Sequence, residues 1–389
     1  MALKNNTWKL NQWYDQSVAG NAEYSTNVLS LYAWGMNSSG SLGQNNLTEY
    51  SSPVQVGSNT TWAKIGATTE GSSMAIKSDG TLWTWGKGSY GVLGHSQSNA
   101  DANNSYSSPK QVPGSTWNEA AGQQQGMTAT KTDGTLWSWG QGTDGQLGQN
   151  ESHGRSSPAQ VGSDTDWDKP VDCRSKCGAA IKTDGTLWTW GENEEGRLGH
   201  NNQTKYSSPV QVPGTWASAV MGRSCSLATK TDGTLWAWGD NTQGELAQNH
   251  RDERSSPVQI PGSTWGTGAG SLASADDWAG ALKTDGTLWF WGRNEYGQLG
   301  QNDDGDRYSS PVQVPGTTWR TIHLGHKSAF ATKTDGTLWS WGYGKRSNIG
   351  LLGLNSTTYY SSPVQIGSET DWHSNLGGSY FTTFGMRMN

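Results

Sequence analysis

Three cysteines are the residues of this chain whose type and spacing first suggest chemistry. Cys173 and Cys177 lie four positions apart, as two sulfur ligands of a metal ion often do, and Cys225 follows later. A structural zinc site needs four nitrogen or sulfur ligands, and His200 and His250 lie at unrelated positions of the pattern described below. We therefore predict no metal site and assign these cysteines to small, buried positions.

Two glycine-rich segments, Gly86–Gly91 and Gly140–Gly145, match the Gly-x-Gly-x-x-Gly pattern of dinucleotide-binding loops. Such a loop works only between a strand and a helix, because the phosphates meet the N-terminus of that helix. No helical periodicity follows either segment. We therefore predict ordinary loops and no cofactor.

The acidic segment Asn302–Asp306 offers oxygens at alternate positions, as a calcium loop does. A calcium-binding EF-hand loop requires Gly at its sixth position and Glu at its twelfth. Here Gly305 is fourth and Gln313 is twelfth, so we predict a solvated acidic loop. The same holds for the acidic segment 192–195.

The histidines do not form a catalytic group, since none recurs beside a nucleophile and an acid. They lie at positions 95, 153, 200, 250, 323, 326 and 373. The Asp residues that do recur stand before Gly, where a hairpin turn uses them. A residue repeated six times belongs to the architecture, whereas a catalytic residue should be an exception within its repeat, so we predict that the protein is not an enzyme.

A repeat of about 51 residues organises the chain and must position any site. The pair Trp-Gly recurs at intervals of 48 to 54 residues, each time followed by Gly-x-Leu-Gly or a close variant. Ser-Ser-Pro and an isolated Trp recur with the same period. The seven Trp-Gly copies begin at Trp34, Trp85, Trp139, Trp190, Trp238, Trp291 and Trp341.

A further marker, Asp-Gly-Thr-Leu-Trp, occurs six times rather than seven. The seventh copy is split between the chain ends, because residues 31–35 supply one strand and residues 379–384 supply its hairpin partner. A ring of blades closed by pairing of N- and C-terminal strands explains this split, since a closed ring leaves no blade edge unpaired.

Each repeat predicts about four short strands. Gly after Asp supplies the positive φ that a tight, primed hairpin turn requires, and Pro in Ser-Ser-Pro suits the start of a strand. In residues 135–140, the period of two places Trp137 and Trp139 on one face. The predicted fold class is all-β, a seven-bladed β-propeller of four-stranded blades over residues 30–389.

The motifs Asp-Gly-Thr-Leu-Trp-x-Trp-Gly, Gly-Gln-Leu-Gly and Ser-Ser-Pro-Val-Gln-Val together resemble the repeat of the regulator-of-chromosome-condensation family. The resemblance covers residues 30–389 and suggests a bacterial or phage-like member. It implies a seven-bladed propeller, in agreement with the repeat count. It implies less about function, because this fold serves unrelated tasks.

Tryptophan dominates the aromatic composition, with 23 Trp against 4 Phe. Most Trp residues recur in the repeat and are predicted to pack between blades, but Trp8, Trp13 and Trp278 do not recur. Trp278 replaces the small residue that other repeats have at its position. If its strand lines the central channel, the indole plugs the channel or contacts a ligand.

Residues 1–29 precede the repeats and form a predicted N-terminal arm. Its Trp8, Trp13 and Tyr14 either pack on the propeller or anchor the arm in a partner, which could be a second copy of the chain. Binding usually uses the loops of a rigid scaffold. The partner-binding candidates are therefore Trp8, Trp13, Tyr14, Trp278, Tyr343, Lys345 and Arg346.

Charge and hydropathy exclude several classes of protein. The net charge is −6 and no Lys/Arg run occurs, so we expect no nucleic-acid partner. No apolar run approaches the ~18 residues that cross a membrane, so we expect no membrane insertion. The N-terminus lacks the apolar segment of a secretory signal, and we expect a soluble protein.

The sequence therefore predicts a non-enzymatic structural or interaction propeller. Its polar, Trp-rich and regular repeats favour a bacteriophage virion component in a tail, fibre or capsid, binding other virion subunits or a host surface receptor. A bacterial protein-binding module resembling the β-lactamase-inhibitor propellers is the alternative. A guanine-nucleotide exchange factor is disfavoured by the acidic charge.

Overall fold

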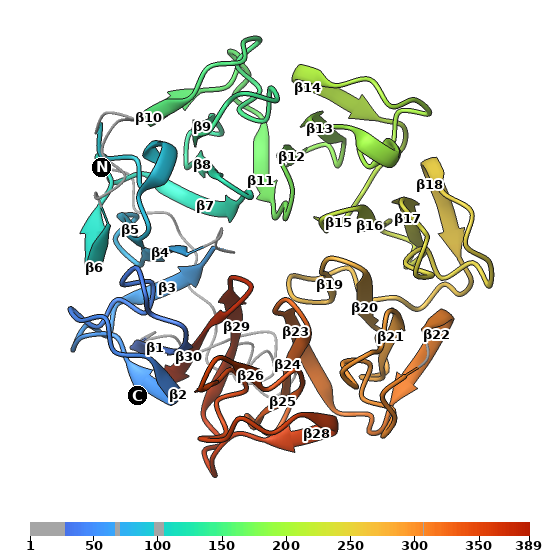
Figure 1. The fold of residues 1–389 in the computed structure, drawn as a ribbon. Coiled ribbons are helices and arrows are strands. Elements are labelled where there is room, and N and C mark those ends of the chain that lie inside the picture. Colours follow the sequence, from blue (N-terminus) through green and yellow to red (C-terminus); the bar gives the residue numbers. More distant parts are fainter. Residues whose placement is uncertain (1–27, 67–70, 97–104, 306) are drawn as a thin grey trace, which may run out of the picture.

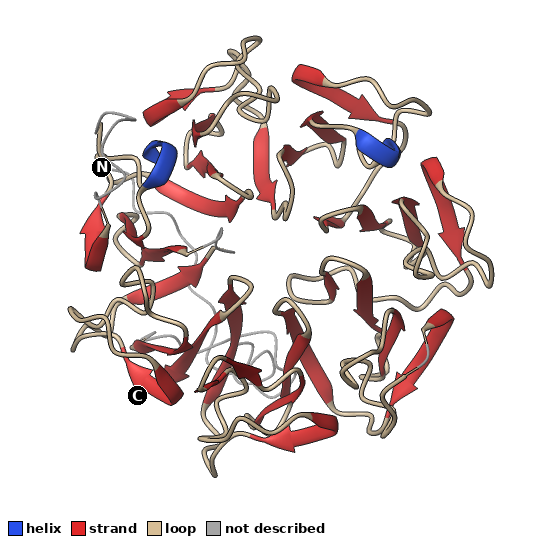
Figure 2. Ribbon diagram, in the orientation of Figure 1, coloured by secondary structure: helices blue, strands red, loops and turns tan. Residues whose placement is uncertain are grey.

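The computed structural model describes residues 28–66, 71–96, 105–305 and 307–389. Seven four-stranded antiparallel sheets stand as blades around a central axis (Figure 1). Strands and loops make up nearly all of the described chain, and the helical turns η1 (Ser89–Gly91) and η2 (Glu194–Gly196) have three residues each (Figure 2). The predicted all-β, seven-bladed propeller is confirmed.

Each blade contains four strands in order from the axis to the rim, and blades 1 to 7 are numbered along the chain. The first strands are β3 (Trp62–Ile65), β7 (Trp117–Gly122), β11 (Trp167–Val171), β15 (Ser218–Met221), β19 (Leu272–Ser274), β23 (Trp319–Leu324) and β29 (Trp372–Gly378). The second strands are β4 (Ser72–Lys77), β8 (Gly126–Lys131), β12 (Cys177–Lys182), β16 (Cys225–Thr229), β20 (Trp278–Leu282), β24 (Ser328–Lys333) and β30 (Thr382–Met388).

The third strands are β5 (Leu82–Gly86), β9 (Leu136–Gly140), β13 (Leu187–Gly191), β17 (Leu235–Gly239), β21 (Leu288–Gly292), β25 (Leu338–Gly342) and β1 (Leu29–Gly35). The outermost strands are β6 (Tyr106–Gln111), β10 (Arg155–Gln160), β14 (Tyr206–Val212), β18 (Arg254–Ile260), β22 (Tyr308–Val314), β28 (Tyr360–Gln365) and β2 (Tyr50–Gln55). A separate hairpin, β26 (Lys345–Arg346) and β27 (Ile349–Gly350), lies between β25 and β28.

Blade 7 joins strands from opposite ends of the described chain. β1 pairs with β30 along its whole length, from Leu29 opposite Met388 to Gly35 opposite Thr382. The inner strands of this blade therefore come from the C-terminal end and its outer strands from the N-terminal end. The predicted closure of the ring is confirmed.

The Asp-Gly-Thr-Leu-Trp motif builds the hairpin between second and third strands. In blade 1, Asp79 Oδ1 accepts from the Thr81 amide at 3.0 Å and from the Thr81 hydroxyl at 2.6 Å, and Thr81 Oγ1 accepts from Trp83 Nε1 at 2.8 Å. The Gly80 amide donates to the Lys77 carbonyl, and Gly80 has a φ of +77° whereas Asp79 is not in the left-handed region. The predicted primed turn is thus wrong, because a three-residue loop ending in a left-handed glycine replaces it.

The Trp residues of the Trp-Gly pairs fill the space between blades. All seven are fully buried. Six donate the indole N–H to a loop carbonyl of the preceding blade over 2.6–2.9 Å. The exception is Trp34, whose Nε1 has no partner among the described residues. The predicted packing role of these Trp residues is confirmed.

The proline of Ser-Ser-Pro lies within the outermost strand rather than at its start. Pro53, for example, is the fourth residue of β2. This position is tolerated because the outermost strand has a neighbour on one side only, so the missing N–H of proline need not break a ladder bond. The pairing of β2 with β1 also shifts register between Ala33 and Gly35.

Candidate interaction surface

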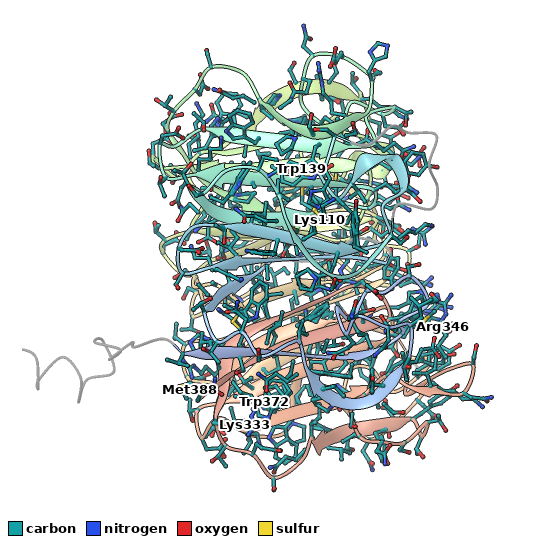
Figure 3. All side chains as sticks on the ribbon, turned by 90° about the vertical axis from the view of Figure 1, so that its left-hand side faces the viewer. Lys110, Trp139, Lys333, Arg346, Trp372 and Met388 are labelled. Carbon is teal, nitrogen blue, oxygen red and sulfur yellow. The ribbon has the colours of Figure 1, made fainter. Side chains whose placement is uncertain are left out.

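The ring has two faces with different chemistry. The turn face carries the Asp-Gly turns, and the loop face carries the loops that follow the first and third strands. In the edge-on view of Figure 3, Met388 and Lys333 lie toward one face and Arg346 lies at the other. Two of the partner-binding candidates, Tyr343 and Lys345, belong to the same loop as Arg346 and therefore to the loop face.

On the turn face, a lysine at or just after the end of the second strand lies over two indole rings. Lys333 Nζ, for instance, is 4.0 Å from the ring centre of Trp339 and 4.6 Å from that of Trp319. Equivalent lysines do the same in the five preceding blades. Since this arrangement repeats from blade to blade, it belongs to the scaffold.

On the loop face, three tyrosines from neighbouring blades pack together. Tyr343 follows β25, and its ring centre lies 4.9 Å from Tyr296 of blade 5 and 5.0 Å from Tyr359. Tyr359 remains 47% exposed. Partial burial and the hydrogen bond with Tyr359 raise the pKa of the Tyr343 hydroxyl, so this hydroxyl stays neutral at physiological pH.

Two cations lie over aromatic rings on this face, one on the tyrosine cluster and one in the loop that carries Tyr343. Lys327 Nζ lies 4.3 Å from the ring centre of Tyr296. The guanidinium carbon of Arg346 lies 3.5 Å from the ring centre of Phe381 in blade 7, and β26 holds Arg346 against β27. We call this group the aromatic–basic patch, and its members are Tyr296, Lys327, Tyr343, Arg346, Tyr359 and Phe381.

A buried carboxylate lies beside the aromatic–basic patch. Asp276 is 6% exposed, and its Oδ2 lies 3.1 Å from His326 Nε2 and 3.7 Å from Arg223. Burial would raise the pKa of Asp276, but the contact with His326 and the charge of Arg174 hold it below its usual value. The neighbouring Ser224 hydroxyl donates to the Asp276 carbonyl at 2.8 Å. This group therefore ties loops of adjacent blades together.

The first strands line a central channel with a volume of about 460 Å³. Within it, Lys64 forms an ion pair with Glu119 of the next blade. Arg174 crosses the loop-face end of the channel, because it reaches from blade 3 to the carbonyl oxygens of Leu324 and Gly325 in blade 6, 3.3 Å from the latter. One side chain thus links two blades on opposite sides of the ring.

Trp278 does not plug this channel. It lies on β20, a second strand, whereas first strands line the channel. Its indole is 1% exposed, packs 5.4 Å from Phe290 and donates to the His326 carbonyl at 3.3 Å. The residue therefore fills the space between blades 5 and 6 and supports the loop that carries His326.

Sequence reasoning found only part of the aromatic–basic patch. Tyr343 and Arg346 lie in it, and the exposed Lys345 lies beside it, whereas Trp8, Trp13 and Tyr14 lie outside the described residues. It missed the other four members. The doubled Tyr359-Tyr360, where other repeats have one Tyr or an Arg, was a visible sign. The contact of Lys327 with Tyr296 left no sign in the sequence, because the two residues belong to different blades.

All three cysteines are buried and unpaired. In the described ranges, no group of three or more His, Cys, Asp or Glu side chains is placed to hold a metal ion. Among the described residues, no helix has the length and apolarity needed to cross a membrane.

The protein is a β-propeller of seven similar blades built from one repeated unit. Its terminal strands close the ring, and the loops of one face differ from blade to blade. The model of the regulator of chromosome condensation (RCC1) repeat matches residues 30–69, 79–121, 133–178, 184–229, 232–266 and 285–332. These segments cover more than half of the chain, which therefore belongs to the RCC1 repeat family.

Two relatives in sequence are human proteins. The E3 ubiquitin-protein ligase HERC2 of Homo sapiens is 32% identical over 198 residues, which are 49% of this chain and 4% of HERC2. Protein RCC2 of Homo sapiens is 28% identical over 144 residues, which are 36% of this chain and 26% of RCC2. The match thus spans a small part of these relatives, and neither supports the expected bacterial or phage-like origin.

Solved structures share the fold. Prp20p from Saccharomyces cerevisiae has a TM-score of 0.81 at 17% identity, covering 94% of this chain and 92% of Prp20p. Human WBSCR16 has a TM-score of 0.79 at 16% identity, covering 93% of this chain and 99% of WBSCR16. The structure of Prp20p was reported together with its binding to Gsp1p and histones.

Proposed function

We propose that this protein is a protein-binding propeller whose partner docks on the aromatic–basic patch of the loop face. The observation that carries the proposal is a cluster of three tyrosines with Lys327 over one of them, next to the contact of Arg346 with Phe381, at a place where the repeat requires neither. Tyr and Arg are the residue types enriched at binding hot spots. The turn face, by contrast, repeats the same Lys–Trp arrangement from blade to blade.

The family and fold support a binding role in general terms. Prp20p binds Gsp1p and histones, and it also binds Kap60 in another structure. Because the identity to Prp20p is 17%, these partners are not transferred to this chain.

Site-specific photo-crosslinking tests the proposal. A photoreactive amino acid replaces Lys345, which is exposed beside the patch, or Lys87, which is exposed after the corresponding Trp-Gly pair of blade 1. We expect a discrete crosslinked protein from position 345 in cells that make the protein, and none from position 87. Equal products at both positions, or a product at position 87 alone, would contradict the proposal.

The identity of the partner stays a prediction. Composition suggests a bacteriophage virion, in which the partner is another virion subunit or a host surface receptor. The eukaryotic relatives described above give this setting no support. Mass spectrometry of purified particles tests it, because a virion component must be present in the particle at a fixed copy number.

Two further candidates share the fold. A module that resembles the β-lactamase-inhibitor propellers would be captured with a target enzyme in a pull-down. An exchange factor, implied by the family resemblance, would accelerate the release of labelled GDP from a small GTPase. The net charge of −6 favours neither a chromatin nor a general nucleic-acid partner.

A further inference from the structure

Two sulfur side chains from neighbouring blades meet at the loop-face end of the central channel. Cys173 follows β11 in blade 3, and its Sγ lies 3.7 Å from Sδ of Met221, the last residue of β15 in blade 4. The backbone fixes this contact, because Cys173 and Met221 form a parallel bridge in which the Arg174 amide donates to the Met221 carbonyl at 2.9 Å.

Cys177 adds a third sulfur from the other strand of the same hairpin. The pairing of β11 with β12 ends with Val171 opposite Ala179. Continued for two residues beyond the end of β11, this register places Cys173 opposite Cys177, with three residues between them. Directly opposed residues of an antiparallel pair point to the same face and lie close together. The two thiols also interact with each other.

The surroundings of the three sulfurs are dry. Cys173 is 3% exposed, Cys177 is fully buried and Met221 is 2% exposed. Thiolate and thioether ligands select soft metal ions such as Cu(I), whereas a structural zinc ion requires four ligands in a tetrahedron. No His, Asp or Glu side chain of the described residues completes such a set here.

We propose that Cys173, Cys177 and Met221 form a binding site for one soft monovalent metal ion, copper(I). Each thiol loses its proton as its sulfur binds the ion, so two protons leave for each ion that enters. The resulting site carries one negative charge.

The central channel supplies the route to this site. Cys173 and Met221 both contribute to the channel wall, together with Arg174. An ion that enters along the axis therefore reaches the wall formed by the two residues that carry Cys173 Sγ and Met221 Sδ.

Cys225 provides an internal comparison. It occupies the same position in blade 4 that Cys177 occupies in blade 3, and it is equally buried. Its Sγ contacts the Ser274 Oγ at 3.4 Å, an oxygen partner, whereas Cys177 interacts with the sulfur of Cys173. Burial of a cysteine at this position is thus a packing feature. Blade 3 differs because a second cysteine, Cys173, interacts with Cys177 and contacts Met221.

Anaerobic competition with a chromophoric copper(I) chelator, bicinchoninate, tests the proposal on the reduced full-length protein. We expect the wild type to withdraw one Cu(I) per chain. Cys177→Ser should weaken binding at least 100-fold, Met221→Leu about tenfold, and Cys225→Ser less than twofold. Other blades have Ser at the Cys177 position, as at Ser72 and Ser328, so the fold should tolerate this substitution.

Two results would overturn the proposal. One is a wild type that withdraws no copper, or no more than the Cys177→Ser variant does. The other is an X-ray absorption spectrum of the copper-loaded protein with nitrogen or oxygen neighbours instead of three sulfurs. If Cys177→Ser does not fold, as judged by circular dichroism, Met221→Leu and the spectrum still decide the question.

Discussion

Trp341 donates its indole N–H to the carbonyl oxygen of Gln298 in the preceding blade, over 2.9 Å. Both residues are fully buried. The same bond links six of the seven pairs of adjacent blades, because the equivalent Trp of five other blades makes the same contact. Trp34 of blade 7 is equally buried but its Nε1 lacks a partner among the described residues.

This difference predicts unequal costs for the same substitution. Trp341→Phe removes packing area and leaves the Gln298 carbonyl without its donor. Trp34→Phe removes packing area together with a buried N–H that has no partner among the described residues. We expect Trp341→Phe to lower the free energy of unfolding by about 1–2 kcal/mol more than Trp34→Phe does. Urea denaturation of both variants measures the difference. Equal losses would show that the indole bond contributes nothing.

Glu245 predicts a pH-dependent stability. Its side chain is fully buried at a position that Gln146 and Gln298 occupy in other blades, and burial raises its pKa from 4.5 to about 8. The native state keeps this proton up to about pH 8, while the unfolded carboxyl releases it near pH 4.5. Stability therefore falls as the pH rises through this window, by up to about 1.4 kcal/mol per pH unit.

Glu245→Gln should remove this dependence, since the amide is uncharged and resembles the protonated acid in shape. We expect the variant to be as stable as the wild type near pH 4.5 and more stable above pH 8, in denaturation curves recorded at both values. Gln298→Glu is the reciprocal control and should create the same dependence in blade 5. A wild-type advantage above pH 8 would refute this role of Glu245.

The lysines of the turn face predict a contrast in salt dependence. Lys131 contacts two indoles, 3.8 Å and 4.9 Å from the ring centres, whereas Lys182 also pairs with Asp164 at 2.7 Å and Asp166 at 3.0 Å. Lys131→Met should cost about 0.5–1 kcal/mol at any salt concentration. Lys182→Met should cost more at low salt, and the excess should shrink in 1 M NaCl because salt screens ion pairs. Identical salt dependence of the two variants would show that the ion pairs of Lys182 with Asp164 and Asp166 do not contribute to stability.

Trp278 predicts a large loss of stability. Trp278→Ser introduces the residue that blade 6 has at this position, Ser328, and opens a cavity between the blades while removing the donor to the His326 carbonyl. We expect a loss of about 3–5 kcal/mol, measured by thermal or urea unfolding. A loss below about 1 kcal/mol would mean that the indole is not packed as described.

Most of the scaffold was predictable from the sequence because motifs such as Trp-Gly and Ser-Ser-Pro recur once in each of the seven blades. The intervals between Trp-Gly pairs gave the number of blades, and the missing seventh Asp-Gly-Thr-Leu-Trp gave the closure that pairs Leu29 with Met388. The turn type was predicted wrongly, since Asp-Gly also fits a three-residue loop in which Gly80 alone is left-handed.

The site was less predictable because its contacts join different repeats. Tyr343 and Arg346 were visible as departures from the repeat, but their partners Tyr296 and Phe381 come from the two flanking blades. Likewise, Arg174 meets Gly325 about 150 residues away. Trp278 also departs from the repeat, but it packs in the core rather than in the channel, because its strand is the second from the axis.

The most direct test of the aromatic–basic patch compares two tyrosines of the loop face. Tyr359 in the patch and Tyr90 in blade 1 are 47% and 45% exposed, so their truncation should affect folding alike. Once the crosslinked partner is identified, isothermal titration calorimetry gives its Kd for each variant. We predict that Tyr359→Ala weakens binding at least tenfold and Tyr90→Ala less than twofold. Equal affinities for the two variants would contradict the assignment of the binding surface to this patch.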